Sequence, residues 1–303
     1  MAAAVSLLSK AKSGFILKPQ IFVIHSAPKV GKTTFASKFP AVIFADLEKG
    51  SMQLDVARVT SDELPDYPSY LAFVDELLAG NHSYKTFVTD SATVLESYIH
   101  RFLCGDKYKF IDDYEGGFGR GHSAAREELQ KLMVKLRKLA EKMTVIILAH
   151  SQVKSFSCPI TNSSYDRYLL QLNQKFAEIM LSGADNILFL KHEVSTTVDS
   201  KTKKTQAFSD GERKIMCEWR SSFDAGNRLN LPPELPLDYQ AFMQAVEIAK
   251  PRSADELIKD ITELMAKVDA DTKELVTAKV KEVGKDQAAL TRIKVKLMSM
   301  VKP

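Results

Sequence analysis

The sequence predicts an α/β protein in which a mainly parallel sheet is covered by helices. Three observations indicate this fold. Apolar, strand-like runs alternate with helical patterns from residue 21 to residue 191, as in sheets buried on both faces. Alternating residues at 192–219 predict an antiparallel β extension, and helix-capping patterns after Pro251 predict a small helical unit. We therefore expect a core domain at residues 1–250 and a three-helix domain at 251–303.

The first predicted strand, residues 21–24, runs directly into a turn-rich segment that ends in Gly-Lys-Thr-Thr, and a helical pattern follows to Phe39. A strand, a loop and a helix in this order form the context of a phosphate-binding P-loop. Backbone N–H groups of such a loop bind phosphate, and Gly31 allows the backbone to approach closely. Lys32 would reach the β- and γ-phosphates, and the Thr33 hydroxyl would be a ligand for Mg²⁺.

Ser26 departs from the P-loop motif, which has glycine at this position. A serine fits only if the position does not require a positive φ. The alternative is an ordinary strand–helix turn with a chance Gly-Lys-Thr sequence. The flanking elements and the spacing favour a site for ATP or GTP.

Further elements of the core follow from their patterns. Strands are predicted at residues 41–45, 85–89, 144–149 and 186–191, and helices at 69–78, 92–103, 123–143, 168–181 and 238–248. Loops are predicted at residues 105–122, 154–167 and 221–236. Three lysines in a predicted turn, Lys201, Lys203 and Lys204, form either a solvated tip or a DNA contact.

The predicted C-terminal unit has a capping pattern at Ser253–Glu256 and a second at Asp271–Glu274. Gly284 ends its second helix and Asp286 begins its third. This unit is either a solvated appendage or a docking module for DNA or a partner protein.

Polar residues follow four of the predicted strands, and the carboxyl ends of parallel strands meet at one edge of a sheet. Asp90 fits the role of a second Mg²⁺ ligand beside Thr33. Glu48 is the candidate to orient the attacking water, with Asp46 as the alternative. His150 or Gln152 could contact the γ-phosphate. The candidate nucleotide-binding residues are Ser26, Ala27, Pro28, Lys29, Val30, Gly31, Lys32, Thr33, Thr34 and Asp90.

The segments VIFADLEKG, FVTDSATVL, GGFGRGHSAAREELQKLMVKLRKL and VIILAHSQVK, in this order, resemble the core of RecA-type recombinases. The resemblance implies that Glu48 is the catalytic glutamate, that Asp90 is linked to Mg²⁺ and that Gln152 is a strand-end switch. It also implies two DNA-binding loops, at roughly residues 112–122 and 153–166.

More closely, SAPKVGKTTFA, AHSQVK, YDRYLLQL and FDAGNRLNLPPELPLD are similar to phage-encoded RecA-like ATPases of the Sak type, which are AAA-family proteins of phage recombination modules. The similarity covers about residues 15–240. It implies an ATP- and Mg²⁺-dependent recombinase or single-strand annealing protein that binds single-stranded DNA and assembles into a ring or filament. A single-strand DNA-binding protein is a candidate partner.

A motif of RadA-like proteins, Lys-Asn-Arg, is similar to residues 226–228, with Gly226 where lysine is expected. The resemblance leaves Arg228, or second Arg220, as a residue that acts on a neighbouring protomer. For DNA phosphates the candidates are Arg120, Lys107, Lys109, Lys154 and Arg167, and for base stacking they are Phe118, Phe156 and Tyr165. Core packing is the alternative for each aromatic ring.

Composition limits the remaining possibilities. A net charge of +4 is compatible with nucleic-acid binding but does not indicate it. The three cysteines are dispersed, which argues against a disulfide framework or a zinc site. The N-terminus does not resemble a signal peptide and no run of eighteen apolar residues occurs, so we expect a cytoplasmic protein without a membrane segment.

Three other hypotheses about the function stay open. A nucleotide or small-molecule kinase would need an arginine-rich lid, which is not evident after Asp90. A nucleotide-binding module with little hydrolysis could anneal DNA or recruit a partner, if Ser26 and Gly226 mark a degenerate site. A helicase with a related core is the third alternative.

Overall fold

The computed structural model describes residues 18–198, 205–250 and 252–300. These residues fall into two compact units, one that ends at Ala249 and one that begins at Lys250. None of the described helices combines the length and the apolar character that a membrane span requires.

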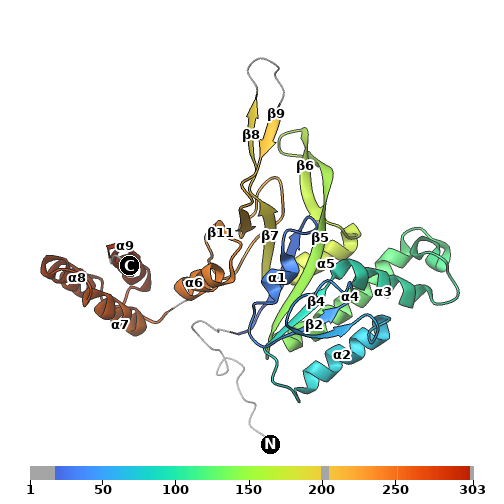
Figure 1. The fold of residues 1–303 in the computed structure, drawn as a ribbon, viewed down its shortest axis with the longest axis horizontal. Coiled ribbons are helices and arrows are strands. Elements are labelled where there is room, and N and C mark those ends of the chain that lie inside the picture. The colour runs from blue at the N-terminus through green and yellow to red at the C-terminus, as the bar shows by residue number, and fades with distance from the viewer. Residues whose placement is uncertain (1–17, 199–204, 251, 301–303) are drawn as a thin grey trace, which may run out of the picture. The chain divides into compact units, whose positions relative to one another are not determined.

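A nine-stranded sheet forms the centre of the larger unit, with the order β11-β10-β7-β1-β5-β4-β2-β3 and with β6 paired to β5 (Figure 1). The six strands from β7 to β3 in this order are parallel, whereas β10, β11 and β6 pair antiparallel. The strands are β1 (Ile21–Ser26), β2 (Val42–Asp46), β3 (Ala57–Thr60), β4 (Thr86–Asp90), β5 (Thr144–Cys158), β6 (Ser163–Leu170), β7 (Asn186–His192), β10 (Arg213–Met216) and β11 (Glu234–Pro236). The prediction of a mainly parallel α/β sheet with an antiparallel extension is confirmed.

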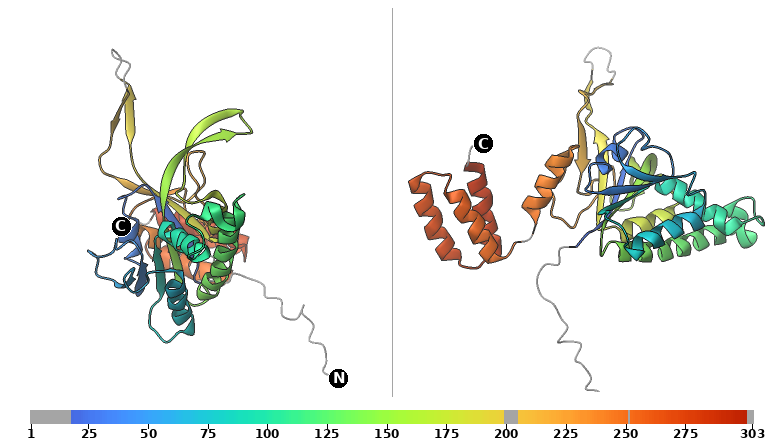
Figure 2. Two further views of the ribbon diagram at one scale, coloured as in Figure 1. Left: turned by 90° about the vertical axis from the view of Figure 1, so that its right-hand side faces the viewer. Right: turned by 60° about the horizontal axis from the view of Figure 1, so that its bottom comes forward.

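Helices cover both faces of the sheet (Figure 2). Successive side chains of each strand point to opposite sides, so each strand contributes apolar residues to a core on either face. Ile21 and Val23 of β1 pack in one core with α2 to α5, and Phe22 and Ile24 pack in a second core with α1 and α6. The helices are α1 (Lys32–Ala36), α2 (Tyr67–Ala79), α3 (Ala92–Cys104), α4 (Arg120–Leu139), α5 (Gln174–Gly183) and α6 (Tyr239–Ala249).

Two β-hairpins project beyond the sheet, one formed by β5 and β6 and the other by β8 (Ser195–Val198) and β9 (Thr205–Phe208) (Figure 1). The first of them corrects the prediction of a loop at residues 154–167. Here β5 continues unbroken and eight residue pairs join it to β6, with Phe156 opposite Tyr165. Most side chains on both faces of this hairpin are polar and exposed, so no apolar alternation marked it as β-structure.

Other boundaries also differ from the prediction. The helix expected at 168–181 begins only at Gln174, where the Asn173 side chain accepts a hydrogen bond from the Lys175 N–H (3.0 Å) and caps it. The helix after the P-loop ends at Ala36 instead of Phe39. The predicted loop at 105–122 contains the 3₁₀ helix η2 (Ile111–Gly116), and β3 and β11 were not predicted. Lys201, Lys203 and Lys204 lie outside the described residues.

The C-terminal unit contains α7 (Ala254–Met265), α8 (Ala270–Val283) and α9 (Gln287–Met300). The capping box at Ser253 is formed, since the Glu256 N–H donates to the Ser253 hydroxyl (3.2 Å) and the Glu256 carboxylate accepts from the Ser253 N–H (2.8 Å). The second cap was placed two residues late, because Asp269 accepts the N–H of Thr272 (2.9 Å).

Candidate functional site

The P-loop joins the carboxyl end of β1 to the start of α1. Within it Lys29 and Gly31 have positive φ angles of 63° and 118°. The glycine also lies against the guanidinium of Arg213, since a Cβ on Gly31 would fall 2.8 Å from Arg213 Nη1. Ser26 is the last residue of β1 and needs no positive φ, so serine is accommodated where the motif has glycine.

Lys32 is buried and points back into the loop. Its ammonium donates hydrogen bonds to the Ser26 hydroxyl (3.1 Å) and to the Ala27 carbonyl (3.5 Å). Burial lowers the pKa of Lys32, and the nearby charges of Asp90 and Glu48 oppose this effect. The Lys32 ammonium is therefore held between the P-loop and the carboxylates of Asp90 and Glu48.

Thr33 and Asp90, the two predicted Mg²⁺ ligands, lie next to each other. The Thr33 hydroxyl donates to Asp90 Oδ2 at 2.7 Å. Burial raises the pKa of Asp90 to about 6, the hydrogen bond from Thr33 opposes that shift, and the charges of Glu48 and Asp46 add to it. A hydroxyl and a buried carboxylate are oxygen ligands of the kind that Mg²⁺ prefers, so these residues fit a magnesium ion.

Glu48 lies two residues beyond the end of β2 and is held by two side chains. Ser91 donates to Glu48 Oε1, and His150 Nε2 lies 3.1 Å from Glu48 Oε2. Because a carboxylate only accepts, this ring nitrogen donates. The hydrogen bond from His150 is the main cause that lowers the pKa of Glu48, and the bond from Ser91 adds to it. Glu48 is thus an oriented, ionised carboxylate beside Asp90.

Asp46 has a different environment. It is fully buried, and its carboxylate accepts hydrogen bonds from the Gly50 N–H (2.9 Å), the Ser51 N–H (3.0 Å) and the Ser51 hydroxyl (2.6 Å). These bonds occupy Asp46 in holding the turn after β2. The geometry therefore favours Glu48 over Asp46 as the residue that could orient a water molecule.

Gln152, predicted as a strand-end switch, and Arg228, predicted to act on a neighbouring protomer, have other hydrogen-bond partners. Gln152 Nε2 donates to the Leu170 carbonyl across the hairpin (3.2 Å). Arg228 donates to Asp185 at 3.0 Å, and Asp185 precedes β7 at the amino edge of the sheet, opposite to the P-loop. Arg228 is therefore not brought to the P-loop of its own chain.

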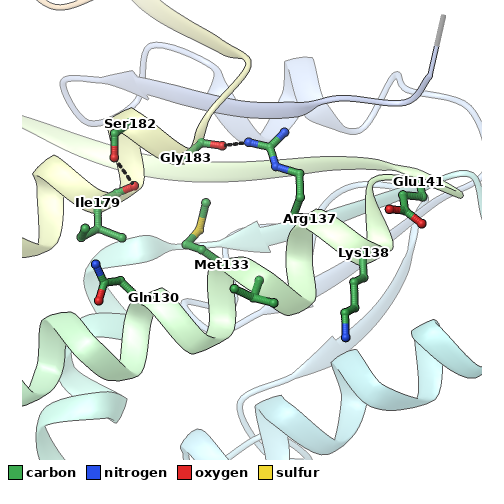
Figure 3. A pocket seen from close by; sticks show the side chains of 9 residues that line it. Gln130, Met133, Arg137, Lys138, Glu141, Ile179, Ser182 and Gly183 are labelled. Carbon is green, nitrogen blue, oxygen red and sulfur yellow. Dashed lines mark hydrogen bonds between the residues drawn. The ribbon is translucent and has the colours of Figure 1, made fainter. Parts of the chain in front are cut away.

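A groove of about 500 Å³ between α4 and α5 lies at the same amino edge. Figure 3 shows Arg137 among the side chains that line it, donating to the Gly183 carbonyl, and Arg137 also donates to Asp185 at 2.7 Å. The groove thus belongs to the edge opposite the P-loop and is no part of the candidate nucleotide site.

The residues predicted to contact DNA differ in their exposure and in the charges around them. Phe118 is fully exposed and Arg120 donates to the Glu115 carbonyl (2.6 Å), but the same segment carries the carboxylates of Asp112, Asp113 and Glu115. In the β5–β6 hairpin, Lys154 is exposed and Phe156 is half-buried against Tyr165 (5.6 Å between ring centroids).

Arg167, expected on a DNA phosphate, is buried instead. Its guanidinium donates to Asp224 at 2.7 Å and lies 5.1 Å from the Phe156 ring and 5.6 Å from the Trp219 ring. It therefore supports the base of the hairpin.

His25 and Arg213 were not singled out from the sequence. His25 is fully buried, with Nε2 2.7 Å from the Asp224 carbonyl and Nδ1 2.9 Å from the Ser151 hydroxyl. A histidine within the otherwise apolar run IFVIHS is a signal that could have identified it. Arg213 donates to the Val30 carbonyl (3.1 Å), and nothing in its local sequence indicates that contact.

Comparison with known proteins is consistent with this arrangement. No curated protein matches the chain. The AAA domain family matches residues 18–229, which is well over half of the chain and includes each element of the site described above. Members of this family generally bind ATP with Mg²⁺. The chain therefore belongs to the AAA domain family of P-loop ATPases.

Proposed function

We propose that the protein hydrolyses ATP at the P-loop and uses this reaction to control a grip on single-stranded DNA, as a recombinase or annealing protein of the phage Sak type would. The observation that carries the proposal is the course of β5. The strand supplies His150 to Glu48 and then continues into the projecting hairpin.

In this proposal Lys32 binds the terminal phosphates, and Thr33 and Asp90 hold Mg²⁺. The bound ion would neutralise charge that develops on the phosphates. Glu48 accepts a hydrogen bond from the attacking water, while Ser91 and His150 fix the direction of its carboxylate. A lowered pKa keeps Glu48 ionised at neutral pH, which is the state that can accept a proton.

A pocket next to the P-loop could hold the nucleoside of the bound nucleotide. A pocket of about 370 Å³ borders Gly31 and Thr34 on one side and Arg213 and Tyr239 on the other. An aromatic ring and an arginine beside the phosphate-binding loop suit a base and its ribose. We assign the nucleoside to this pocket in the proposed complex.

The β5–β6 hairpin is the proposed DNA-binding element, in preference to the acidic segment around Phe118. Near it, Trp219 keeps 57% of its surface exposed, and Phe156 and Tyr165 present rings. Base–aromatic stacking contributes roughly 1–3 kcal/mol per base and tolerates any sequence, and Lys154 adds a phosphate contact. Assembly of several copies, with Arg228 acting between them, is part of the proposal.

Trp219 gives a direct test, because it is the only tryptophan of the chain. Titration with oligo-dT should quench its fluorescence. We expect Phe156→Ala to weaken this binding roughly 5- to 150-fold, in line with the loss of one stacked base. Phe208→Ala, an exposed ring in the other hairpin, is the matched control.

ATP turnover is measured separately as phosphate release with and without the oligonucleotide. Lys32→Ala should abolish nucleotide binding, and Glu48→Gln should keep binding but lose turnover. Glu76→Gln, an exposed carboxamide substitution on α2, should behave as the unaltered protein. Turnover that continues in Glu48→Gln would refute the assigned role, and an absence of oligonucleotide binding at low salt would refute the DNA-binding function alone.

A further inference from the structure

The C-terminal unit has a groove of about 430 Å³ between α8 and α9. Val276 and Leu297 form its buried floor, whereas Leu275 and Met300 at its sides keep 69% and 49% of their surface exposed. Exposed large apolar side chains that gather around one depression are typical of a binding surface. The groove is therefore apolar surface that the three helices of this unit leave uncovered.

Basic side chains line the same groove. Lys279 comes from α8, and Arg292 and Lys296 come from α9, while Asp271 is the one acidic residue that lines it. All the charged residues of α9 are basic. Among the described residues, Lys279 and Arg292 make no ion pair, whereas Lys294, outside the groove, is paired with Asp260 at 2.6 Å. The rim thus carries an excess of positive charge over an apolar floor.

The charges are arranged along the groove in a definite order. A three-residue turn joins α8 to α9, so the two helices run antiparallel and Lys279 and Arg292 lie toward the turn. Asp271 and Met300 lie toward the other end. From Asp271 to Lys279 the groove follows α8 for about 12 Å, or roughly two helical turns. This length suits a short helix that inserts apolar residues at i, i+3 or i+4, and i+7.

We propose that the α8–α9 groove binds a short amphipathic helix of a partner protein, whose apolar face is flanked by acidic residues. Apolar anchors would cover Leu275 and Met300, and carboxylates would pair with Lys279 and Arg292. A nucleic acid could pair with the same rim, but it would leave the apolar floor exposed to water, so the floor favours a peptide. This inference is independent of the proposed ATPase and DNA-binding functions.

The test is a selection from a library of random 14-residue displayed peptides on the full-length protein, followed by fluorescence anisotropy with the enriched peptides. We expect enriched sequences with apolar residues at helical spacing and Asp or Glu near one end. Leu275→Glu should weaken their binding at least tenfold. The double variant Lys279→Glu/Arg292→Glu should do the same, and it should regain binding to peptides in which lysine replaces the acidic residues.

Lys281→Glu is the matched control, since it changes the same charge at an exposed position of α8 outside the groove. Circular dichroism confirms that each variant keeps its helices. Enriched peptides without acidic residues, or binding that Leu275→Glu leaves unchanged, would overturn the proposal. Competition by oligo-dT that depends on Lys279 and Arg292 but not on Leu275 would identify a nucleic-acid surface instead. A sedimentation coefficient that falls in Leu275→Glu would identify a second copy of this chain as the occupant.

Discussion

His25 should make the stability of the protein depend on pH in a way that a single substitution removes. Its Nε2 lies 2.7 Å from the Asp224 carbonyl, which can only accept, so Nε2 carries the proton. Nδ1 then accepts from the Ser151 hydroxyl at 2.9 Å. The neutral ring thus satisfies both partners. A charged ring would be buried at a cost that the nearby charge of Asp224 offsets only in part. Burial accordingly lowers the pKa of His25 from 6.5 to about 4.

The size and sign of the effect follow from this shift. Below pH 6.5 the unfolded chain binds a proton at His25 that the folded protein does not bind until about pH 4. Stability therefore falls as the pH decreases through this window. A shift of about two and a half units corresponds to roughly 3 kcal/mol in full, of which about 2.5 kcal/mol is lost by pH 4.5.

His25→Gln removes the titration and can retain both hydrogen bonds, because an amide nitrogen donates and an amide oxygen accepts. Urea unfolding is followed by circular dichroism in EDTA. From pH 7.5 to pH 4.5, the free energy of unfolding of the unaltered protein should fall by about 2.5 kcal/mol more than that of His25→Gln. Comparing the two proteins cancels the titration of the groups that they share. His192→Gln, at an exposed ring, is the control. Parallel pH profiles for the unaltered protein and His25→Gln would refute the buried, neutral state of His25.

Three further substitutions test other contacts. In EDTA at pH 7.5, Asp90→Asn should raise the free energy of unfolding by up to about 3 kcal/mol, because burial raises the pKa of Asp90 to about 6. This gain should vanish near pH 4, where the carboxyl is protonated in the folded protein, and urea unfolding measures it. Phe242→Ala should cost about 3–5 kcal/mol in the same assay, because the ring is buried edge-on against Phe35. Arg167→Ala should destabilise the protein by about 1–3 kcal/mol by leaving Asp224 without its partner, and a thermal shift that is absent would contradict this.

The central strands could be predicted because their local sequence and their final environment agree. Residues 21–24 and 145–149 are continuous apolar runs, and each of these residues is buried in the sheet. By contrast, β3 is a four-residue edge strand, Ala57 to Thr60, with every side chain half-buried and a mixed composition. Its position is set by pairing with β2 and not by any periodicity of its own.

In the candidate site, too, some residues could be predicted from the sequence and some contacts could not. Asp90 is the last residue of a strand, Lys32, Thr33 and Glu48 follow strands, and topology alone brings the ends of parallel strands together. The hydrogen bond between His25 and Asp224 joins residues 199 positions apart in the chain, and only the folded structure specifies it. Sequence patterns therefore identified the residues at the strand ends but not the contacts that orient them.

The strand β5 runs without a break from the central sheet, past the candidate site, into the hairpin with β6. Thr144 to Ala149 pair with β1 and β4 in the sheet, His150 lies opposite Ser26, and Ser151 to Cys158 pair with β6 in the hairpin. If the hairpin residues were a flexible loop, ordering them would cost roughly 1–2 kcal/mol per residue, and nucleotide binding would have to supply that free energy. The β-ladder already fixes them, so no such cost arises and the hairpin is a continuation of β5. Any coupling between the nucleotide site and the hairpin would therefore change the hairpin's orientation, with its internal structure preserved.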